Sequence, residues 1–329
     1  MRGAMLRRLI PDPFILAILT SVLLASLLPA RGGFAVLVSG LATATVVLLF
    51  FFHGARLPRD QVLAGLVHWR LHVLILGFTF VFFPVLALAL DRAFPALLPP
   101  ALWIGVLYLA ALPSTVQSAI AFTSIAGGNV PAAIAASSAS QMIGIFLTPL
   151  LVGVLVGTHG GGAGISGIGT IVLEILVPFL VGHALRPWIG GWVVRNRRTV
   201  GLTDRATVVI AVYSAFSAAV IEGIWGRLPL PVLGILFLLC MAMLAIALGA
   251  TWGIGGLLGF SREDRIAILF CGTKKSIIQG VPMARVLFAA RDVGIILLPV
   301  MIFHQMQLMA CAWIARRIGG DKEASDGRG

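Results

Sequence analysis

Long apolar runs separated by short polar stretches make up most of the chain. The runs are close to the roughly 20 residues that a helix needs to cross the hydrocarbon core of a bilayer. This pattern predicts an all-α polytopic membrane protein with ten transmembrane helices. The runs lie near residues 12–30, 34–53, 68–90, 101–126, 130–157, 166–187, 205–225, 230–258, 265–289 and 293–315.

Composition agrees with that pattern. Of the 329 residues, 59% are hydrophobic and only 11% are charged, with a mean hydropathy of +1.05. A soluble domain has about 25% charged residues, so this chain cannot cover its own surface with polar groups in water. We therefore expect a multi-pass protein of the cytoplasmic (inner) membrane in contact with the lipid bilayer.

The placement of the basic residues predicts the orientation. If the N-terminus is cytoplasmic, 17 of the 24 Lys and Arg residues fall on its side of the membrane and five on the other. Such a bias is what the positive-inside rule expects, and it places both termini in the cytoplasm. Because these charges are confined to short loops between apolar runs, the net charge of +12 does not indicate nucleic-acid binding.

Two polar interruptions occupy matching positions in the fourth and ninth runs. They read "LPSTVQSAI" (Leu112–Ile120) and "CGTKKSIIQG" (Cys271–Gly280). Broken helices at corresponding places in two halves predict two inverted five-helix repeats and mark a transporter's binding site. Ordinary Pro and Gly kinks are the alternative. The candidate substrate- or ion-binding residues, with one from the tenth run, are Ser114, Thr115, Gln117, Ser118, Thr273, Lys274, Lys275, Ser276 and His304.

The adjacent lysines Lys274 and Lys275 require compensation in mid-membrane. A lysine at the bilayer centre costs about 2.5–3.5 kcal/mol on insertion scales. The carbonyl-bearing C-terminus of a half-helix carries partial negative charge and attracts a cation. We therefore expect at least one ammonium to bind such carbonyls, while the other pairs with an anionic substrate or releases a proton.

Four stretches carry a resemblance to a known family: "LPSTVQSAIAFTSIAGGNVPAAI", "SSASQMIGIFLTPLLVG", "FCGTKKSIIQGVPM" and "FHQMQL". They resemble the bile acid:sodium symporter family, and most closely its orphan branch of bacterial and animal homologues. The resemblance implies a core domain (68–158 and 229–316) that moves against a smaller panel domain (11–58 and 166–226) within one transporter unit. Residues 319–329 then form a cytoplasmic tail.

The chain departs from the sodium-coupled members at their ion sites. Those members resemble Glu-x-Gly-x-Gln-Asn-Ser around the ninth break; here Phe270 takes the glutamate position, and Lys274 and Lys275 take those of the Gln-Asn pair. A hard cation prefers several oxygens including a carboxylate, so we expect one ammonium to occupy the place of a sodium ion. By resemblance, a family glutamine falls on Thr79, and the retained sodium-ligand types are Ser118 and Ser137.

Together these features predict a secondary-active transporter of a small organic anion that works by alternating access. A strictly sodium-coupled symporter of the same fold and a non-transporting membrane scaffold or regulator are the alternatives. No catalytic, Walker or dinucleotide motif appears in a suitable context, so we expect neither an enzyme nor an ATP-driven pump. We expect no cofactor; the coupling ion (Na⁺, H⁺ or none), the substrate and the oligomeric state stay open.

Overall fold

The computed structural model describes residues 13–56, 68–157, 172–223, 226, 228–288 and 293–326. Within these ranges every regular element is helical, which confirms the all-α prediction. In chain order the elements are α2 (Pro13–Leu27), α3 (Gly32–Ala55), α5 (Trp69–Gly77), η1 (Phe78–Phe82), α6 (Phe83–Ala93), η2 (Pro95–Leu97), α7 (Pro100–Ala111), α8 (Gln117–Ile125), α9 (Val130–Gly157), η3 (Val172–Leu176), α11 (Val177–Arg195), α12 (Arg197–Ile221), α14 (Leu230–Leu257), α15 (Arg262–Gly272), α16 (Ile277–Leu287) and α17 (Val293–Asp326).

Six helices in the described ranges are long and apolar enough to cross a membrane. They are α3, the continuous segment from α5 to α6, α9, α12, α14 and α17. The fourth and ninth predicted spans are each divided into two half-helices, α7 with α8 and α15 with α16, so neither half reaches that length. The apolar helices α2 and α7 are also shorter than a full span.

Two segments differ from the predicted spans. The basic stretch between the sixth and seventh runs reads as a loop in the sequence, but α11 continues to Arg195 and α12 begins at Arg197, with Asn196 between them. Arginine is a good helix former, so the helices continue after the apolar runs end. Likewise α17 continues to Asp326, into the predicted tail.

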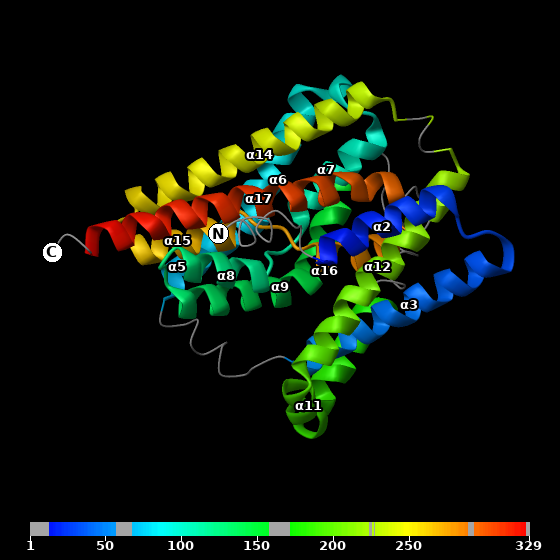
Figure 1. The fold of residues 1–329 in the computed structure, drawn as a ribbon, viewed down its shortest axis with the longest axis horizontal. Helices are drawn as coiled ribbons and strands as arrows, with labels where there is room; N and C mark the ends of the chain where they lie inside the picture. The colour runs from blue at the N-terminus through cyan, green and yellow to red at the C-terminus, as the bar shows by residue number, and fades with distance from the viewer. Residues whose placement is uncertain are drawn as a thin grey trace, which may run out of the picture.

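The helices pack in two groups (Figure 1). Helices α2, α3, α11 and α12 with η3 form the first, here called the α3 group. The second, called the crossover group, contains α5 to α9 and α14 to α17 with η1 and η2. Helix α12 joins the two groups because it also packs against α16 and α17.

Two glycines allow α3 and α11 to pack closely. A Cβ atom on Gly54 would collide with the backbone carbonyl of Phe179 in α11, and one on Gly182 would collide with the carbonyl of Phe51 in α3. Small residues of this kind let the backbones of membrane helices approach each other. The contact therefore depends on glycine at both positions.

The two predicted breaks are present and lie against each other. Helix α7 ends at Ala111, before Pro113, and α15 ends at Gly272. The backbone N–H of Ser276 donates to the carbonyl of Pro113 at 2.8 Å, and the Ser114 hydroxyl donates to the carbonyl of Cys271 at 2.6 Å. Each break thus satisfies main-chain groups of the other.

Candidate functional site

Lys275 is buried where the two breaks meet, with only 1% of its surface exposed. Its ammonium donates to three backbone carbonyls: Thr79 and Ala110, each at 2.7 Å, and Leu112 at 2.9 Å. The same nitrogen lies 4.3 Å from the centre of the Phe83 ring. Charge-assisted hydrogen bonds and a cation–π contact thus replace the water that the ammonium loses.

The local sequence explains why the Thr79 carbonyl is available. Residues Phe78–Phe82 form a π-helix, in which the N–H of Phe83 bonds to the carbonyl of Phe78. In that register the carbonyl of Thr79 would pair with residue 84, which is Pro84 and has no N–H. The Thr79 hydroxyl donates back to Ile75, so Thr79 contacts Lys275 through its backbone.

The other two acceptors lie at the C-terminus of α7. A continuing helix would pair the Ala110 carbonyl with the N–H of Ser114, but that N–H donates to the Ser140 hydroxyl at 3.0 Å. Leu112 is already extended and lies outside the helix. Both carbonyls belong to the partly negative end of α7. This geometry agrees with the expectation that half-helix carbonyls compensate an ammonium.

Helix α17 holds the backbone of Lys275. The Lys275 N–H donates to Oε1 of Gln307 at 2.8 Å, and Nε2 of Gln307 donates to the Lys275 carbonyl at 2.9 Å. That Nε2 also lies 3.0 Å from Nδ1 of His304. The predicted residue His304 therefore belongs to the network that positions Lys275.

Lys274 points to a different partner. It is fully buried, and its ammonium lies 3.4 Å from the Ser118 hydroxyl and 4.1 Å from the centre of the Phe122 ring, both in α8. The Ser118 hydroxyl is also 2.8 Å from that of Thr115. The two neighbouring lysines thus have separate environments, as residues at adjacent positions do.

A cavity of about 570 Å³ lies between the two helix groups. Five predicted residues line it: Thr115, Gln117, Ser118, Ser276 and His304. Lys274, Lys275 and Thr79 are not among its lining residues. Three further predicted hydroxyls have partners within the protein, since Ser114 contacts the Cys271 carbonyl, Ser137 contacts the Cys271 sulfur, and Thr273 contacts the Leu269 carbonyl.

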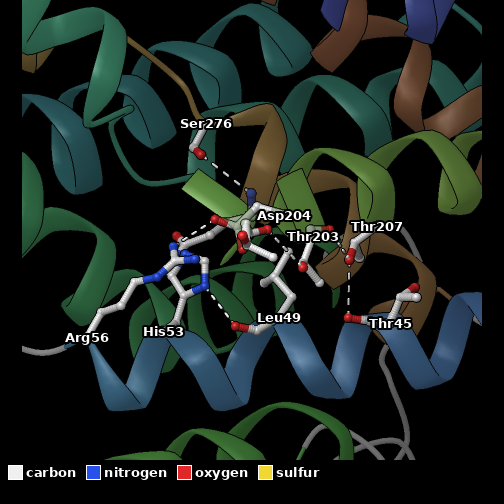
Figure 2. Close-up of polar contacts among 10 residues, drawn as sticks. Thr45, Leu49, His53, Arg56, Thr203, Asp204, Thr207 and Ser276 are labelled. Carbon is white, nitrogen blue, oxygen red and sulfur yellow. Dashed lines mark hydrogen bonds and ion pairs between the residues drawn. The ribbon is translucent and has the colours of Figure 1, made fainter. Parts of the chain in front are cut away.

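The α3 group supplies a charged wall that the sequence alone does not predict. Nη1 of Arg56 donates to Oδ2 of Asp204 at 2.7 Å. His53, one turn before Arg56, contacts the Leu49 carbonyl at 2.8 Å through Nδ1. Figure 2 shows His53 and Arg56 extending from α3 toward Asp204 of α12, with Ser276 of the second break beyond them. All four side chains line the cavity.

Only a weak signal in the sequence points to this wall. Arg56 follows an apolar run and Asp204 precedes one, so the hydrophobic pattern assigns both to loops. They are 148 positions apart, and no pattern in the chain connects them. An acidic residue directly before an apolar run is the single indication, and it does not identify the partner.

The predicted sodium ligands stay a prediction. Ser118 and Ser137 lie in α8 and α9, where their hydroxyls face Thr115 and Lys274 in the first case and Cys271 in the second. In the part of the chain that the structure describes, no three His, Cys, Asp or Glu side chains form a group that could hold a metal ion.

An apolar helical chain with two contacting broken helices beside a cavity is typical of a membrane transporter. The sequence profile of the SBF-like CPA transporter family matches residues 12–319, and the chain belongs to this family. This result confirms the resemblance found in the sequence, and it places the protein among transporters, not enzymes.

Its relatives include bacterial and animal proteins. "Uncharacterized protein PA2026" of Pseudomonas aeruginosa is 51% identical over 94% of this chain and 93% of its own length. "Putative symporter YfeH" of Escherichia coli (strain K12) is 48% identical over 93% and 92%. "Sodium/bile acid cotransporter 7" of Xenopus tropicalis is 28% identical over 93% and 91%.

Proposed function

We propose that the protein is a secondary-active carrier of a small organic anion. The crossover group would act as the core domain (68–158 and 229–316) and the α3 group as the panel domain (11–58 and 166–226). Ten spans would form two inverted repeats in the cytoplasmic membrane, with α7–α8 as the fourth and α15–α16 as the ninth. The names of the relatives, a symporter and a sodium/bile acid cotransporter, support this class of activity.

The observation that carries the proposal is the cavity between the two groups. Its volume of about 570 Å³ lies in the usual range for small-molecule sites, about 300–1,000 Å³. Residues of both broken helices line one wall and charged residues of α3 and α12 line the other. A movement of one group against the other would therefore change access to whatever the cavity holds.

The proposal includes a cation that is part of the chain. The ammonium of Lys275 receives three carbonyl oxygens and an aromatic face at the crossing point, which is the type of coordination that a bound monovalent cation would otherwise have. Because the charge is covalently attached, the crossing helices would be held together without added sodium. Transport would then be independent of a sodium gradient.

Uptake into proteoliposomes tests the proposal with a mixture of candidate substrates. Vesicles containing the purified protein are incubated with a defined set of organic anions, and their contents are measured by mass spectrometry. We expect at least one anion to enter these vesicles faster than protein-free vesicles. No selective entry of any anion would instead favour the scaffold or regulator.

A further inference from the structure

The charged wall of the cavity contains an ion pair with unused hydrogen-bonding capacity. Arg56 and Asp204 share one hydrogen bond, between Nη1 and Oδ2. Nη2 of Arg56 and Oδ1 of Asp204 are both buried and have no partner. One buried donor and one buried acceptor therefore occur together on side chains that line the cavity.

The opposite wall has a matching unused acceptor. Gln279 in α16 has no exposed surface, and its Nε2 donates to the carbonyl of Gln141 at 3.2 Å. Its Oε1 is buried without a partner, although the side chain lines the cavity. A polar group left unpaired in the protein interior costs about 1–3 kcal/mol, so a ligand that pairs it gains that free energy.

The remaining charges favour an anion. Arg197 and Arg205 of α12 also line the cavity, so three arginines face a single aspartate there. Most other lining residues are apolar, among them Ile134, Met142, Ile145 and Phe179. The cavity thus combines an excess of positive charge, an apolar surface, and two acceptors that require hydrogen-bond donors.

We infer that the cavity binds an amphipathic organic anion that carries hydroxyl groups, with its anionic group on Arg56 and its hydroxyl donors on Asp204 or Gln279. Rotation of these side chains brings Nη2, Oδ1 and Oε1 to the ligand. The inference rests on the proposed function because it takes this cavity as the substrate site. It adds a specificity-determining residue in each helix group, and both would contact the same ligand molecule.

Three probes on one ring system separate the two interactions: a hydroxynaphthoate with its substituents at opposite ends, the naphthoate without the hydroxyl, and the naphthol without the carboxylate. Equilibrium dialysis measures their binding to the full chain in lipid nanodiscs. Since the carboxylate contributes a charge-assisted hydrogen bond and the hydroxyl a neutral one, we expect the naphthol to bind the wild-type protein at least about tenfold more weakly than the hydroxynaphthoate. We expect the naphthoate to bind more weakly by about twofold to tenfold.

Variants assign the groups to residues. Arg56→Gln should weaken hydroxynaphthoate binding by about tenfold or more, whereas Arg198→Gln, an exposed arginine of α12 outside the lining, should not change it. Gln279→Leu should reduce the preference for the hydroxynaphthoate over the naphthoate. Wild-type protein that binds no hydroxynaphthoate, or an Arg56→Gln protein that binds it like wild type, would overturn the inference.

The comparison between probes on the wild-type protein remains decisive if a variant does not fold. Equal binding of the hydroxynaphthoate and the naphthol would exclude the anion subsite. Binding is measured here without transport, so selective binding with no uptake of any anion would contradict the proposed function alone. Uptake of an organic anion that Arg56→Gln leaves unchanged would contradict this inference alone.

Discussion

At the scale of single residues, Lys275 explains how a charged side chain is tolerated inside the crossing point. Pro84 and the π-helix leave the carbonyl of Thr79 unpaired, and the end of α7 leaves those of Ala110 and Leu112 unpaired. The ammonium binds all three. The cost of burying the charge and the cost of burying these carbonyls therefore offset each other.

Replacement of Lys275 by Met should destabilise the protein far more than the same change at Lys274. Lys275→Met leaves three buried carbonyls unpaired, and breaking such a buried set costs about 3–5 kcal/mol. Lys274→Met, the matched control, removes one long hydrogen bond of 3.4 Å. Denaturant unfolding of the purified variants measures the difference. Equal losses of stability would show that the carbonyl contacts of Lys275 contribute little.

Gln117 and Ser118 test whether the first break contacts substrate. Both line the cavity, and Gln117 is exposed to it. Replacing both by Ala should lower organic-anion uptake without lowering the amount of protein in the membrane, because the lost groups contact ligand and not the fold. Immunoblotting measures abundance beside uptake. Unchanged uptake would mean that the break has only a structural role.

At the scale of helices, the two breaks could be predicted from the sequence, whereas the π-helix could not. Pro113 and the polar residues around it mark the first break, and Gly272 with the lysine pair marks the second. The π-helix at Phe78–Phe82 lies in a plain apolar run. Its effect depends on which carbonyl Pro84 leaves unpaired, and that in turn depends on the register of the helix.

The contact of α3 with α11 gives a prediction at this scale. Gly182→Ala places a methyl group against the backbone of Phe51, so the helices must separate, at a cost of about 1–3 kcal/mol. Gly191→Ala on the same helix meets open space and should be neutral or slightly stabilising. Thermal unfolding in detergent compares the two. A Gly182→Ala protein as stable as wild type would disprove the close contact.

At the scale of the whole molecule, the sequence predicts the class and the approximate spans but misses the cavity wall. Apolar periodicity and the positive-inside bias depend on neighbouring residues, so they can be identified in one chain. The wall formed by Arg56 and Asp204 depends on how α3 packs against α12. No local pattern encodes that packing, and the hydrophobic pattern therefore assigns these charges to loops.

Orientation in the membrane is also a property of the whole chain. With both termini cytoplasmic, a cysteine at position 161, which lies outside the described residues, should react with an impermeant thiol reagent from the outside. A cysteine at position 197 should react only from the inside. Cys240, Cys271 and Cys311 are buried and provide an unreactive background. Labels on the opposite sides, or both on one side, would contradict the ten-span topology.

The central claim is that a lysine of the chain itself, and not a sodium ion, stabilises the crossing point during transport. The direct measurement is the initial rate of uptake of the organic anion identified in proteoliposomes, compared between sodium and choline buffers of equal ionic strength. We expect equal rates in the two buffers, and no added uptake when an inward sodium gradient is imposed. Uptake that requires sodium would contradict the claim and would support the sodium-coupled alternative.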